Sequence, residues 1–465
     1  MTRTVVAGVD SSTQSCKIVR VDAETGEVLS KTVAPHPDGT AVDPERWWDA
    51  FRQAGGQDLD DAAAVSVSAQ QHGMVALDGA GVPVHEALLW NDVRSAAQAE
   101  RLRREIGPDN WAREVGVVPV SSFTITKLAW LAEARPELAA RVRQVLLPHD
   151  WLTWRLTGRA DTPVTDRSDA SGTGYWSVPE GRYREDLLAH AFGRVPELPV
   201  VLDSAAAAGR TRAGALVAAG CGDNAGAALG LGLQPGEVAV SIGTSGTVFA
   251  STDRTVTDPS GMVAGFADAS GRNLPLLATI NGARILASTA ELLGVDLDEL
   301  DRLAAAAEPD AGGLTMIPYF DGERTPNLPH ARASLTGMSR ANMSRANMAR
   351  AAVLGLLCHL AEALDVLRAQ GIPTRRVLLI GGGARSLTLR SAAADIFQTE
   401  VVVPVPGEYV ALGAARQAAW ALAGTDAPPT WQRRVESAFA PDPSADWAQQ
   451  VRADYRAARA GFYGA

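Results

Sequence analysis

The chain has 465 residues, a formal net charge of −10 and a hydrophobic fraction of 46%. That length is enough for two domains with substantial cores. The acidic balance argues against a nucleic-acid partner, because proteins that bind the phosphate backbone usually carry a basic patch. The sequence shows neither a secretion signal nor a long apolar segment, so we expect no membrane partner.

The three cysteines, Cys16, Cys221 and Cys358, lie far apart in the sequence. Their number and spacing predict neither a disulfide framework nor a metal site. A sparse, scattered set of thiols is typical of a reducing compartment, so we expect a cytoplasmic protein.

The first half of the chain predicts strands alternating with helices. Residues 5–21 form two β-branched runs around a turn of Gly, Ser and Thr, which is the pattern of a β-hairpin. We expect further strands at 26–33, 64–68 and 75–77, helices starting near residue 44, within 93–145, at 149–156 and at 222–233, and a loop over 200–219. Pro235 and Gly236 mark a boundary that divides the chain into domains 1–235 and 236–465.

The second half opens with the same hairpin pattern. Residues 238–250 predict another hairpin with a tip of small residues. We expect helices at 285–293, 346–367, 386–397 and 411–422, strands at 376–380 and 401–403, and a terminal helix after the proline-rich stretch 427–442. The pentapeptide 339–343 is repeated at 344–348, and either copy is able to start the helix that follows.

The two hairpin tips suit phosphate binding. Small residues at a turn expose consecutive backbone N–H groups, and such a concave arrangement accommodates phosphate oxygens. One tip in each half of the chain favours a duplicated fold that binds a polyphosphate.

Asp10 lies at the turn of the first hairpin. A carboxylate repels phosphate, so it fits a phosphate site only if Mg²⁺ or a Mg²⁺-bound water lies between them. Thr13 and Gln14 can donate hydrogen bonds to phosphate oxygens, and Lys17 offers a positive charge. The alternative is an ordinary turn aspartate that accepts hydrogen bonds from its own backbone.

Asp223 lies between small residues at the start of a predicted helix. A helix N-terminus favours the ionised carboxylate, which can then accept a proton, and small neighbours leave room for a ligand. The alternative is a simple helix cap.

Three further segments of the sequence are candidates for ligand contacts. Gln71 and His72 lie in a loop after a buried strand, where uncharged polar side chains suit sugar hydroxyls, although a solvent-facing loop is the alternative. Trp90 belongs to a polar cluster that lines a pocket or caps a helix. Gly382 and Gly383 follow a buried strand, as in nucleotide-binding turns, but this pattern alone is weakly specific.

Taken in order, these motifs resemble the FGGY carbohydrate kinases, and among them the xylulokinases most closely. The resemblance runs through nearly the whole chain. Its main segments are the hairpin at 10–17, QQHGM at 70–74, LWNDVR at 89–94, TDRSDASGT at 165–173, GDNA at 222–225, SIGTSG at 241–246, GERTP at 322–326 and GGGARS at 381–386.

The resemblance implies an α/β, two-domain actin-like ATPase fold, made of duplicated ribonuclease-H-like domains with a deep interdomain cleft. It implies ATP and Mg²⁺ as cofactors, a sugar bound by the first domain and ATP bound by the second. Asp223 takes the position of the catalytic base, and Asp10 takes that of the Mg²⁺ residue. The sugar contacts are then Gln71, His72, Trp90 and Asn224, and the nucleotide contacts are Thr13, Gln14, Lys17, Gly243, Thr244, Gly382 and Gly383.

Some positions depart from the family pattern. Xylulokinases often have Met at the position of Gln71, and Trp and Gln on the adenine side where this chain has Leu389 and Ser391. His72 favours xylulose, because glycerol kinases carry an Arg-Glu pair there.

The activity implied by the resemblance is ATP-dependent phosphorylation of D-xylulose to D-xylulose 5-phosphate, as in D-xylose catabolism. One alternative is another FGGY kinase that acts on ribulose, gluconate, fuculose or glycerol. A second alternative, from a different class, is a non-catalytic actin-like protein that binds nucleotide. The sequence leaves a homodimer open.

Overall fold

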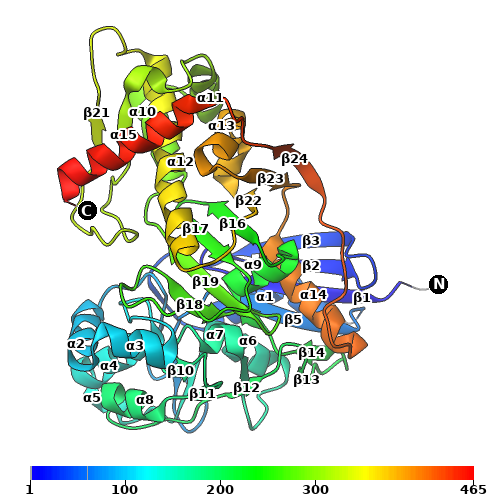
Figure 1. Cartoon of the computed structure of the whole chain (residues 1–465). Helices are drawn as coiled ribbons and strands as arrows, with labels where there is room; N and C mark the ends of the chain where they lie inside the picture. The colour runs from blue at the N-terminus through cyan, green and yellow to red at the C-terminus, as the bar shows by residue number, and fades with distance from the viewer. Residues whose placement is uncertain (1–2, 60, 465) are drawn as a thin grey trace. The chain divides into compact units, whose positions relative to one another are not determined.

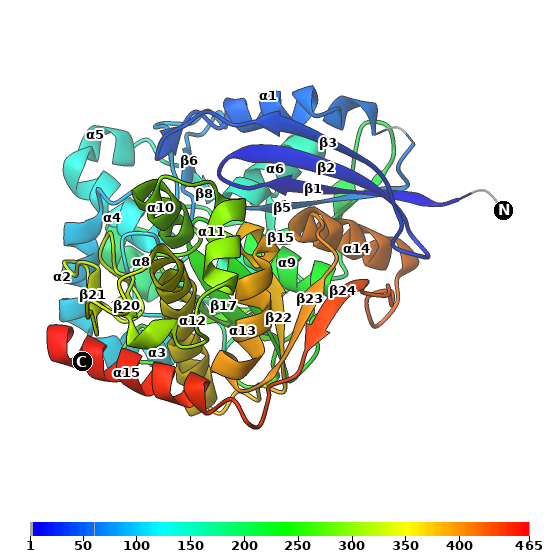
Figure 2. The same cartoon turned by 90° about the horizontal axis from the view of Figure 1, so that it is seen from above.

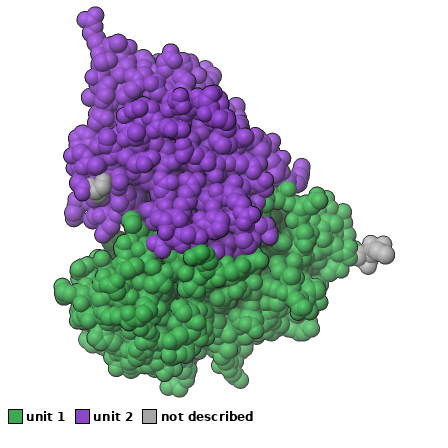
Figure 3. Space-filling model, viewed as in Figure 1, with its two compact units in different colours: residues 1–233, 253–274, 407–433 green, residues 234–252, 275–406, 434–465 purple. Residues whose placement is uncertain are grey.

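The computed structural model describes residues 3–59 and 61–464. The chain forms two compact units (Figures 1 and 3). Unit 1 comprises residues 1–233, 253–274 and 407–433, and unit 2 comprises residues 234–252, 275–406 and 434–465. The sequence predicts a single boundary after residue 235. The first break falls after Leu233, and two later segments belong to unit 1 as well.

Unit 1 is built on a seven-stranded sheet of order β13-β14-β5-β1-β2-β3, in which β15 also pairs with β5. Its strands are β1 (Val5–Ser11), β2 (Ser15–Asp22), β3 (Val28–Pro35), β5 (Ala64–Ala69), β13 (Ala207–Arg210), β14 (Leu216–Ala218) and β15 (Cys221–Gly222). Strands β1 and β2 form the predicted hairpin, with Asp10 opposite Lys17, and β1 is parallel to β5. The expected hairpin at 5–21 is therefore confirmed.

Alternate residues of this sheet face two different layers of helices, as the twofold period of a strand requires. On one face, Val9 and Ile18 pack in the same core cluster as Trp47 of α1 (Glu45–Gln53) and aromatic residues of α6 (Pro148–Leu156). On the other face, Val19 packs with Ala411 of α14 (Tyr409–Ala423). Figure 2 shows α1 and α14 on opposite sides of these strands. Unit 1 is thus a sheet covered by helices on both faces.

Helix α14 belongs to unit 1 because glycines let it approach very closely. A Cβ atom added to Gly8 of β1 would lie 1.9 Å from the carbonyl oxygen of Ala411. A Cβ atom added to Gly413 would lie 1.8 Å from the carbonyl oxygen of Gly226, in α9 (Asp223–Leu231). Backbone therefore packs directly against backbone where α14 crosses β1 and α9.

The predicted loop over 200–219 is wrong. This segment contains β12 (Val200–Leu202), β13 and β14, because β12 pairs with the distant strand β9 (Val164–Asp166) and β14 pairs with β5. The other elements of unit 1 are β4 (Ala41–Val42), η1 (Gly56–Asp58), β6 (Val75–Leu77), β7 (Ala87–Leu88), α2 (Ala96–Ile106), α3 (Pro108–Val115), α4 (Thr124–Ala134), α5 (Pro136–Ala139), β8 (Gln144–Leu146), α7 (Arg167–Ala170), β10 (Trp176–Ser177), β11 (Arg182–Tyr183), α8 (Glu185–Phe192) and β18 (Ala264–Ala267).

Unit 2 repeats the central pattern of unit 1. Its strands follow the order β19-β17-β16-β22-β23-β24, with β19 (Asn273–Ala278), β17 (Gly246–Ala250), β16 (Glu237–Ile242), β22 (Arg376–Ile380), β23 (Glu400–Pro404) and β24 (Val435–Phe439). Strand β16 is antiparallel to β17 and parallel to β22, just as β1 is antiparallel to β2 and parallel to β5. The expected two-domain α/β fold with a duplicated hairpin is confirmed.

The remaining elements of unit 2 are mostly helical. They are α10 (Arg284–Leu293), α11 (Leu297–Ala305), η2 (Ala311–Gly313), β20 (Thr315–Ile317), β21 (Ser334–Thr336), α12 (Arg345–Ala369), η3 (Gly382–Arg385), α13 (Leu387–Phe397) and α15 (Asp446–Tyr463). Helix α12 starts at the second copy of the pentapeptide, where the Ser344 hydroxyl accepts a hydrogen bond from the Asn347 N–H at 3.1 Å. Across the described residues, none of the helices combines the length and the apolar character that a membrane crossing requires.

Candidate active site

Three parallel strands of unit 1 end side by side. Ala69 at the end of β5 is paired with Ser11 of β1 on one side and with Gly222 of β15 on the other. Asp10 directly precedes Ser11, and Asp223 directly follows Gly222. Both carboxylates therefore lie at the same edge of the sheet. The carboxyl ends of parallel strands are where open α/β sheets bind their ligands.

Asp223 is the first residue of α9, and Gly222 occupies the cap position. One Asp223 carboxylate oxygen accepts hydrogen bonds from the Asn224 backbone N–H at 2.7 Å and from the Asn224 side-chain amide at 2.8 Å. Burial, and after it the nearby Asp10 carboxylate, raise the pKa of Asp223 to about 7. The helix terminus, which favours ionisation, is therefore outweighed, and both protonation states are available near neutral pH.

Asp10 is buried and held by two donors. Its carboxylate accepts hydrogen bonds from the Ser12 hydroxyl and from the Lys17 ammonium, the latter at 3.2 Å. The same ammonium forms an ion pair with Glu408 at 3.1 Å, and Glu408 also binds Lys31 at 2.9 Å. Burial raises the pKa of Asp10, and Lys17 opposes this effect. Lys17 is thus not an isolated phosphate ligand, because its charge compensates two carboxylates.

Gln71 connects the loop after β5 with the start of α9. Its side-chain oxygen accepts a hydrogen bond from the Asn224 amide at 3.4 Å, and its side-chain nitrogen donates to the backbone carbonyl of Ser168 at 3.3 Å. Because Asn224 also binds Asp223, the Gln71 amide and the Asp223 carboxylate share one partner. Two predicted sugar contacts and the predicted base therefore form one hydrogen-bonded group.

His72 is fixed in orientation. Its backbone φ is 69°, a left-handed conformation that non-glycine residues seldom adopt. The ring Nδ1 donates to the Gly172 carbonyl at 2.7 Å, and the ring contacts Phe123 and Phe266 at centroid distances of 4.8 and 5.5 Å. A side chain held by a strained backbone, a hydrogen bond and two aromatic rings is well suited to a binding site.

Trp90 extends the cluster to the tip of the first hairpin. Its indole N–H donates to the Thr13 hydroxyl at 2.8 Å, although the Trp90 side chain remains partly exposed. Gln14 lies exposed beside Thr13 in the turn between β1 and β2. This hydrogen bond therefore joins the indole to the turn.

Unit 2 carries two adjacent turns. Gly243 and Thr244 form the tip between β16 and β17, and Gly382 and Gly383 lie just after β22. A Cβ atom added to Gly383 would lie 2.3 Å from the Ile242 side chain at the end of β16, whereas no atom lies within 4 Å of a Cβ added to Gly382. The turn at Gly382 and Gly383 therefore packs against the end of β16, and the space beside Gly382 is open.

Leu389 in α13 is fully buried, whereas Ser391 is exposed. Leu389 therefore packs in the core of unit 2.

The predicted site residues fall into one cluster in each unit. The cluster in unit 1 contains Asp10, Thr13, Gln14, Lys17, Gln71, His72, Trp90, Asp223 and Asn224, and the cluster in unit 2 contains Gly243, Thr244, Gly382 and Gly383. Ser12, Ser168 and Glu408 hold members of the first cluster. The sequence assigned no role to Ser12 or Glu408, and it indicated Ser168 only as part of the polar segment 165–173. Glu408 had a detectable signal, because it follows a glycine and precedes a helix of small residues, as Asp223 does.

The donors of unit 1 fit a divalent cation. Mg²⁺ prefers carboxylate oxygens, usually one or two together with waters and substrate phosphates. Asp10 and Asp223 are close enough for the charge of the first to raise the pKa of the second. A cation beside Asp10 would relieve this repulsion, so the chemistry of the pair agrees with the predicted metal role of Asp10.

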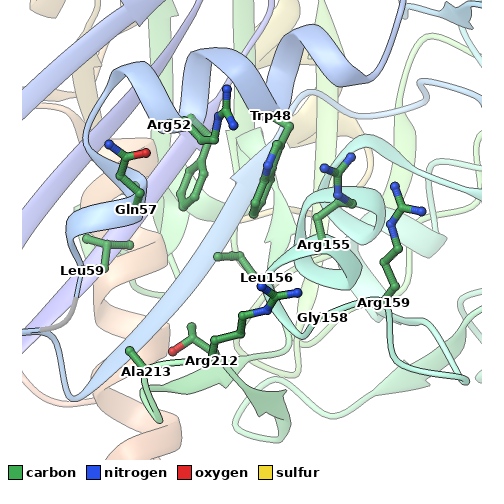
Figure 4. A pocket seen from close by; sticks show the side chains of 13 residues that line it. Trp48, Arg52, Gln57, Leu59, Arg155, Leu156, Gly158, Arg159, Arg212 and Ala213 are labelled. Carbon is green, nitrogen blue, oxygen red and sulfur yellow. The ribbon is translucent and has the colours of Figure 1, made fainter.

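A separate pocket of about 460 Å³ in unit 1 contains none of these residues (Figure 4). Arginines from α1, from the end of α6 and from the turn after β13 line it, together with Trp48. The Arg155 guanidinium lies between the rings of Trp48 and Trp151, at 4.8 and 4.9 Å, and it pairs with Glu45. This arginine therefore contributes to the packing of α1 on α6.

Comparison with known proteins gives concordant matches over most of the chain. The N-terminal domain model of the FGGY family of carbohydrate kinases matches residues 5–232, and the C-terminal domain model matches residues 238–422. The chain is 47% identical over 454 residues to a xylulose kinase of Streptomyces rubiginosus, covering 94% of this chain and 92% of that protein. It is 32% identical to the xylulose kinase of Escherichia coli, covering 88% and 89% of the two chains.

The solved structures give the same result. The crystal structure of a xylulose kinase from Bifidobacterium adolescentis superimposes with a TM-score of 0.91 and 44% identity, covering 98% of this chain and 99% of that one. Two domain models that together span most of the sequence agree with relatives of near-equal length. The chain belongs to the FGGY family of carbohydrate kinases.

Proposed function

We propose that this protein transfers the γ-phosphoryl group of ATP to the terminal hydroxyl of D-xylulose and releases D-xylulose 5-phosphate. The relatives of highest identity described above carry the name xylulose kinase. The observation that carries the proposal is the hydrogen-bonded group of Gln71, Asn224 and Asp223, in which a carboxyl with a pKa near 7 adjoins two amides suited to sugar hydroxyls. D-Xylose catabolism is the corresponding metabolic role.

Asp223 acts as the general base in this proposal. The ideal pKa of a catalytic base lies near the working pH, and burial together with Asp10 brings Asp223 there. The Asn224 amide and N–H hold one carboxylate oxygen in place. The Asp223 carboxylate accepts the proton of the sugar hydroxyl as that oxygen attacks phosphorus.

Sugar recognition falls to the neighbouring side chains. Gln71 and Asn224 offer both donors and acceptors, as vicinal hydroxyls require. His72 and Trp90 present rigid rings beside them, and a rigid ring loses little entropy when it binds. Together they orient the terminal hydroxyl toward Asp223, and such orientation supplies a large part of the rate in phosphoryl transfer.

ATP and Mg²⁺ complete the proposed site. In unit 2, the backbone N–H groups at the turns around Thr244 and Gly382 suit the phosphate oxygens of ATP. In unit 1, the tip around Thr13 offers N–H groups of the same kind. Asp10 is the residue proposed to hold Mg²⁺, directly or through water, and Lys17 with Ser12 fixes its carboxylate. When bound, Mg²⁺ supplies positive charge that stabilises the transferred phosphoryl group. Because ATP is supplied in the cytoplasm, we propose that the protein acts there.

The test is a coupled assay of ADP release with a panel of D-xylulose, D-ribulose, gluconate, fuculose and glycerol. We expect D-xylulose to give the highest kcat/KM, with D-xylulose 5-phosphate as product. Asp223→Asn should keep sugar binding by calorimetry and lower turnover by roughly 10²–10⁴-fold, the scale of general base catalysis. Preference for another sugar would refute the substrate. Nucleotide-dependent assembly with no sugar-stimulated ADP release would refute catalysis.

A further inference from the structure

A buried charged group lies behind the candidate active site, and none of its members is among the residues that bind sugar or ATP in the proposal. It consists of His149 and Asp150 in the first turn of α6 and of Asp169 in α7, all with no exposed surface. The His149 Nδ1 atom lies 2.6 Å from a carboxylate oxygen of Asp169, and Nε2 lies 3.3 Å from one of Asp150. The imidazole is therefore held between two carboxylates.

The charges favour an imidazolium. Burial lowers the pKa of His149, but Asp150, Asp169 and Asp166 outweigh it and raise that pKa to about 9. The 2.6 Å separation of Nδ1 and the Asp169 oxygen is that of a hydrogen bond, so a proton lies between these two atoms.

Helix α7 transmits the position of this group to the active site. The Asp166 side chain caps α7 by accepting from the backbone N–H groups of Ser168 and Asp169, at 2.9 and 3.0 Å. The Ser168 hydroxyl accepts the Gly222 N–H at 3.1 Å, immediately before Asp223. The adjacent Ser168 carbonyl accepts the Gln71 amide at 3.3 Å. A single residue of α7 thus holds both the segment that presents the base and a sugar contact.

His149 also contacts that segment directly. A Cβ atom added to Gly220 would lie 2.4 Å from the His149 ring and 2.8 Å from the Val67 carbonyl oxygen. Gly220 has φ of 85°, so the chain there needs glycine and fits closely over the ring. The imidazole thus packs directly against the 220–223 segment and also binds α7 through Asp169.

We propose that His149 is a positioning residue for phosphoryl transfer: held by Asp150 and Asp169, it fixes α7, and Ser168 of α7 in turn orients Asp223 and Gln71. The inference rests on the proposed roles of Asp223 and Gln71. A displacement of about 1 Å in such a site costs roughly 10²-fold in rate.

Two variants separate the parts of this arrangement. Ser168→Ala removes the hydroxyl that binds Gly222 and the Asp166 carboxylate, and it keeps the carbonyl that binds Gln71. We therefore expect kcat to fall by roughly 10–100-fold with little change in the KM for sugar. His149→Gln loosens α7 as a whole, so kcat should fall and KM should rise together. The two losses should be non-additive in the double variant, because Ser168→Ala already removes the hydroxyl through which α7 holds Gly222. His149→Lys, which restores a cation between the carboxylates, should recover part of kcat.

The matched control is Ser95→Ala. Ser95 lies in unit 1 and is as fully buried as Ser168. Its hydroxyl contacts the Ser121 carbonyl at 3.1 Å and the Thr126 hydroxyl at 3.0 Å, and Ser95→Ala removes both contacts. It has no hydrogen bond to α7 or to the 220–223 segment among the described residues. We expect it to keep wild-type kcat and KM while it loses a similar amount of stability in urea unfolding.

The second readout does not depend on activity. Amide hydrogen exchange, read by mass spectrometry, should speed up in the peptide that contains residues 220–224 in Ser168→Ala and His149→Gln, but not in Ser95→Ala. If exchange changes while the wild-type protein phosphorylates none of the sugars, the proposed function fails, and only the structural link from His149 to residues 220–224 stands. Unchanged exchange and kinetics in a folded His149→Gln protein would overturn the inference. Additive losses, or a metal ion bound by the wild type and lost in His149→Gln, would overturn it as well.

Discussion

At the scale of single residues, two carboxyls determine the behaviour of the candidate site. Asp10 is compensated by Lys17 and Ser12, whereas Asp223 accepts hydrogen bonds from Asn224 and is repelled by the carboxylates of Asp10 and Asp169. The sequence indicates both residues, but it cannot indicate this asymmetry. Glu408, which pairs with Lys17, and Ser168, which binds Gly222 and Gln71, are distant in sequence and reach the site only through the fold.

The pKa of Asp223 predicts a pH dependence of activity. As a general base, Asp223 must be ionised, so kcat/KM for sugar should rise with pH up to about 7 and then level off. The measurement is a pH profile of kcat/KM for the wild type and for Asp223→Asn. The residual activity of Asp223→Asn should not show this rise with pH. If the rise persists in Asp223→Asn, it comes from another group, such as Asp169.

The same shift has a consequence of opposite sign for stability. Between the ordinary aspartate pKa of 3.8 and about 7, the folded protein keeps a proton on Asp223 that the unfolded chain has lost. The folded state then binds more protons, so the free energy of unfolding contributed by this group falls as pH rises through that window. Activity and stability therefore respond to the ionisation of Asp223 in opposite directions.

At the scale of helices and strands, the sequence predicts what depends on local pattern. Both hairpins, the strands 64–68 and 376–380 and the helix at 149–156 were expected, because β-branched runs, turn residues and apolar spacing are properties of neighbouring residues. The strands within 200–219 were missed. They are three or four residues long, and their pairing with β9 and β5 gives them their structure.

Close packing of α14 on α9 predicts a sharp sensitivity at Gly413. Gly413→Ala would place a methyl group 1.8 Å from the Gly226 carbonyl oxygen, so we expect a loss of roughly 1–3 kcal/mol or more in stability. Calorimetric unfolding measures the change. Gly461→Ala in α15 is the control, because no atom lies within 4 Å of its added Cβ, and alanine favours a helix by up to about 1 kcal/mol. Equal stability of the two variants would contradict the packing argument.

At the scale of the whole molecule, the two units are not two consecutive stretches of chain. Unit 1 takes its α14 layer from residues 407–433, after most of unit 2. A boundary at residue 235, read from Pro235 and Gly236, is a sound local inference. The sequence could not indicate that α14 returns to unit 1, because its small-residue surface is equally suited to many partners.

This organisation predicts that residues 1–235 do not fold alone. Such a fragment leaves bare the face of β1 that contains Val6 and the surface of α9 around Gly226. We expect it to bind a hydrophobic dye and to unfold in urea without a cooperative transition. The same fragment joined to residues 407–433 through a flexible Gly-Ser linker should regain cooperativity. Cooperative unfolding of residues 1–235 without that addition would show that α14 is dispensable for unit 1.

The position of α14 near the end of the sequence has a consequence for folding during synthesis. A ribosome adds about 5–20 residues per second, so on the order of tens of seconds separate the emergence of β1 from that of residues 407–433. During that interval the nascent first unit exposes the apolar face that Ala411 and its neighbours later cover. Unit 1 therefore cannot finish folding before residues 407–433 are made. Chaperone binding to the nascent chain should be greatest before the last tenth of the chain is made.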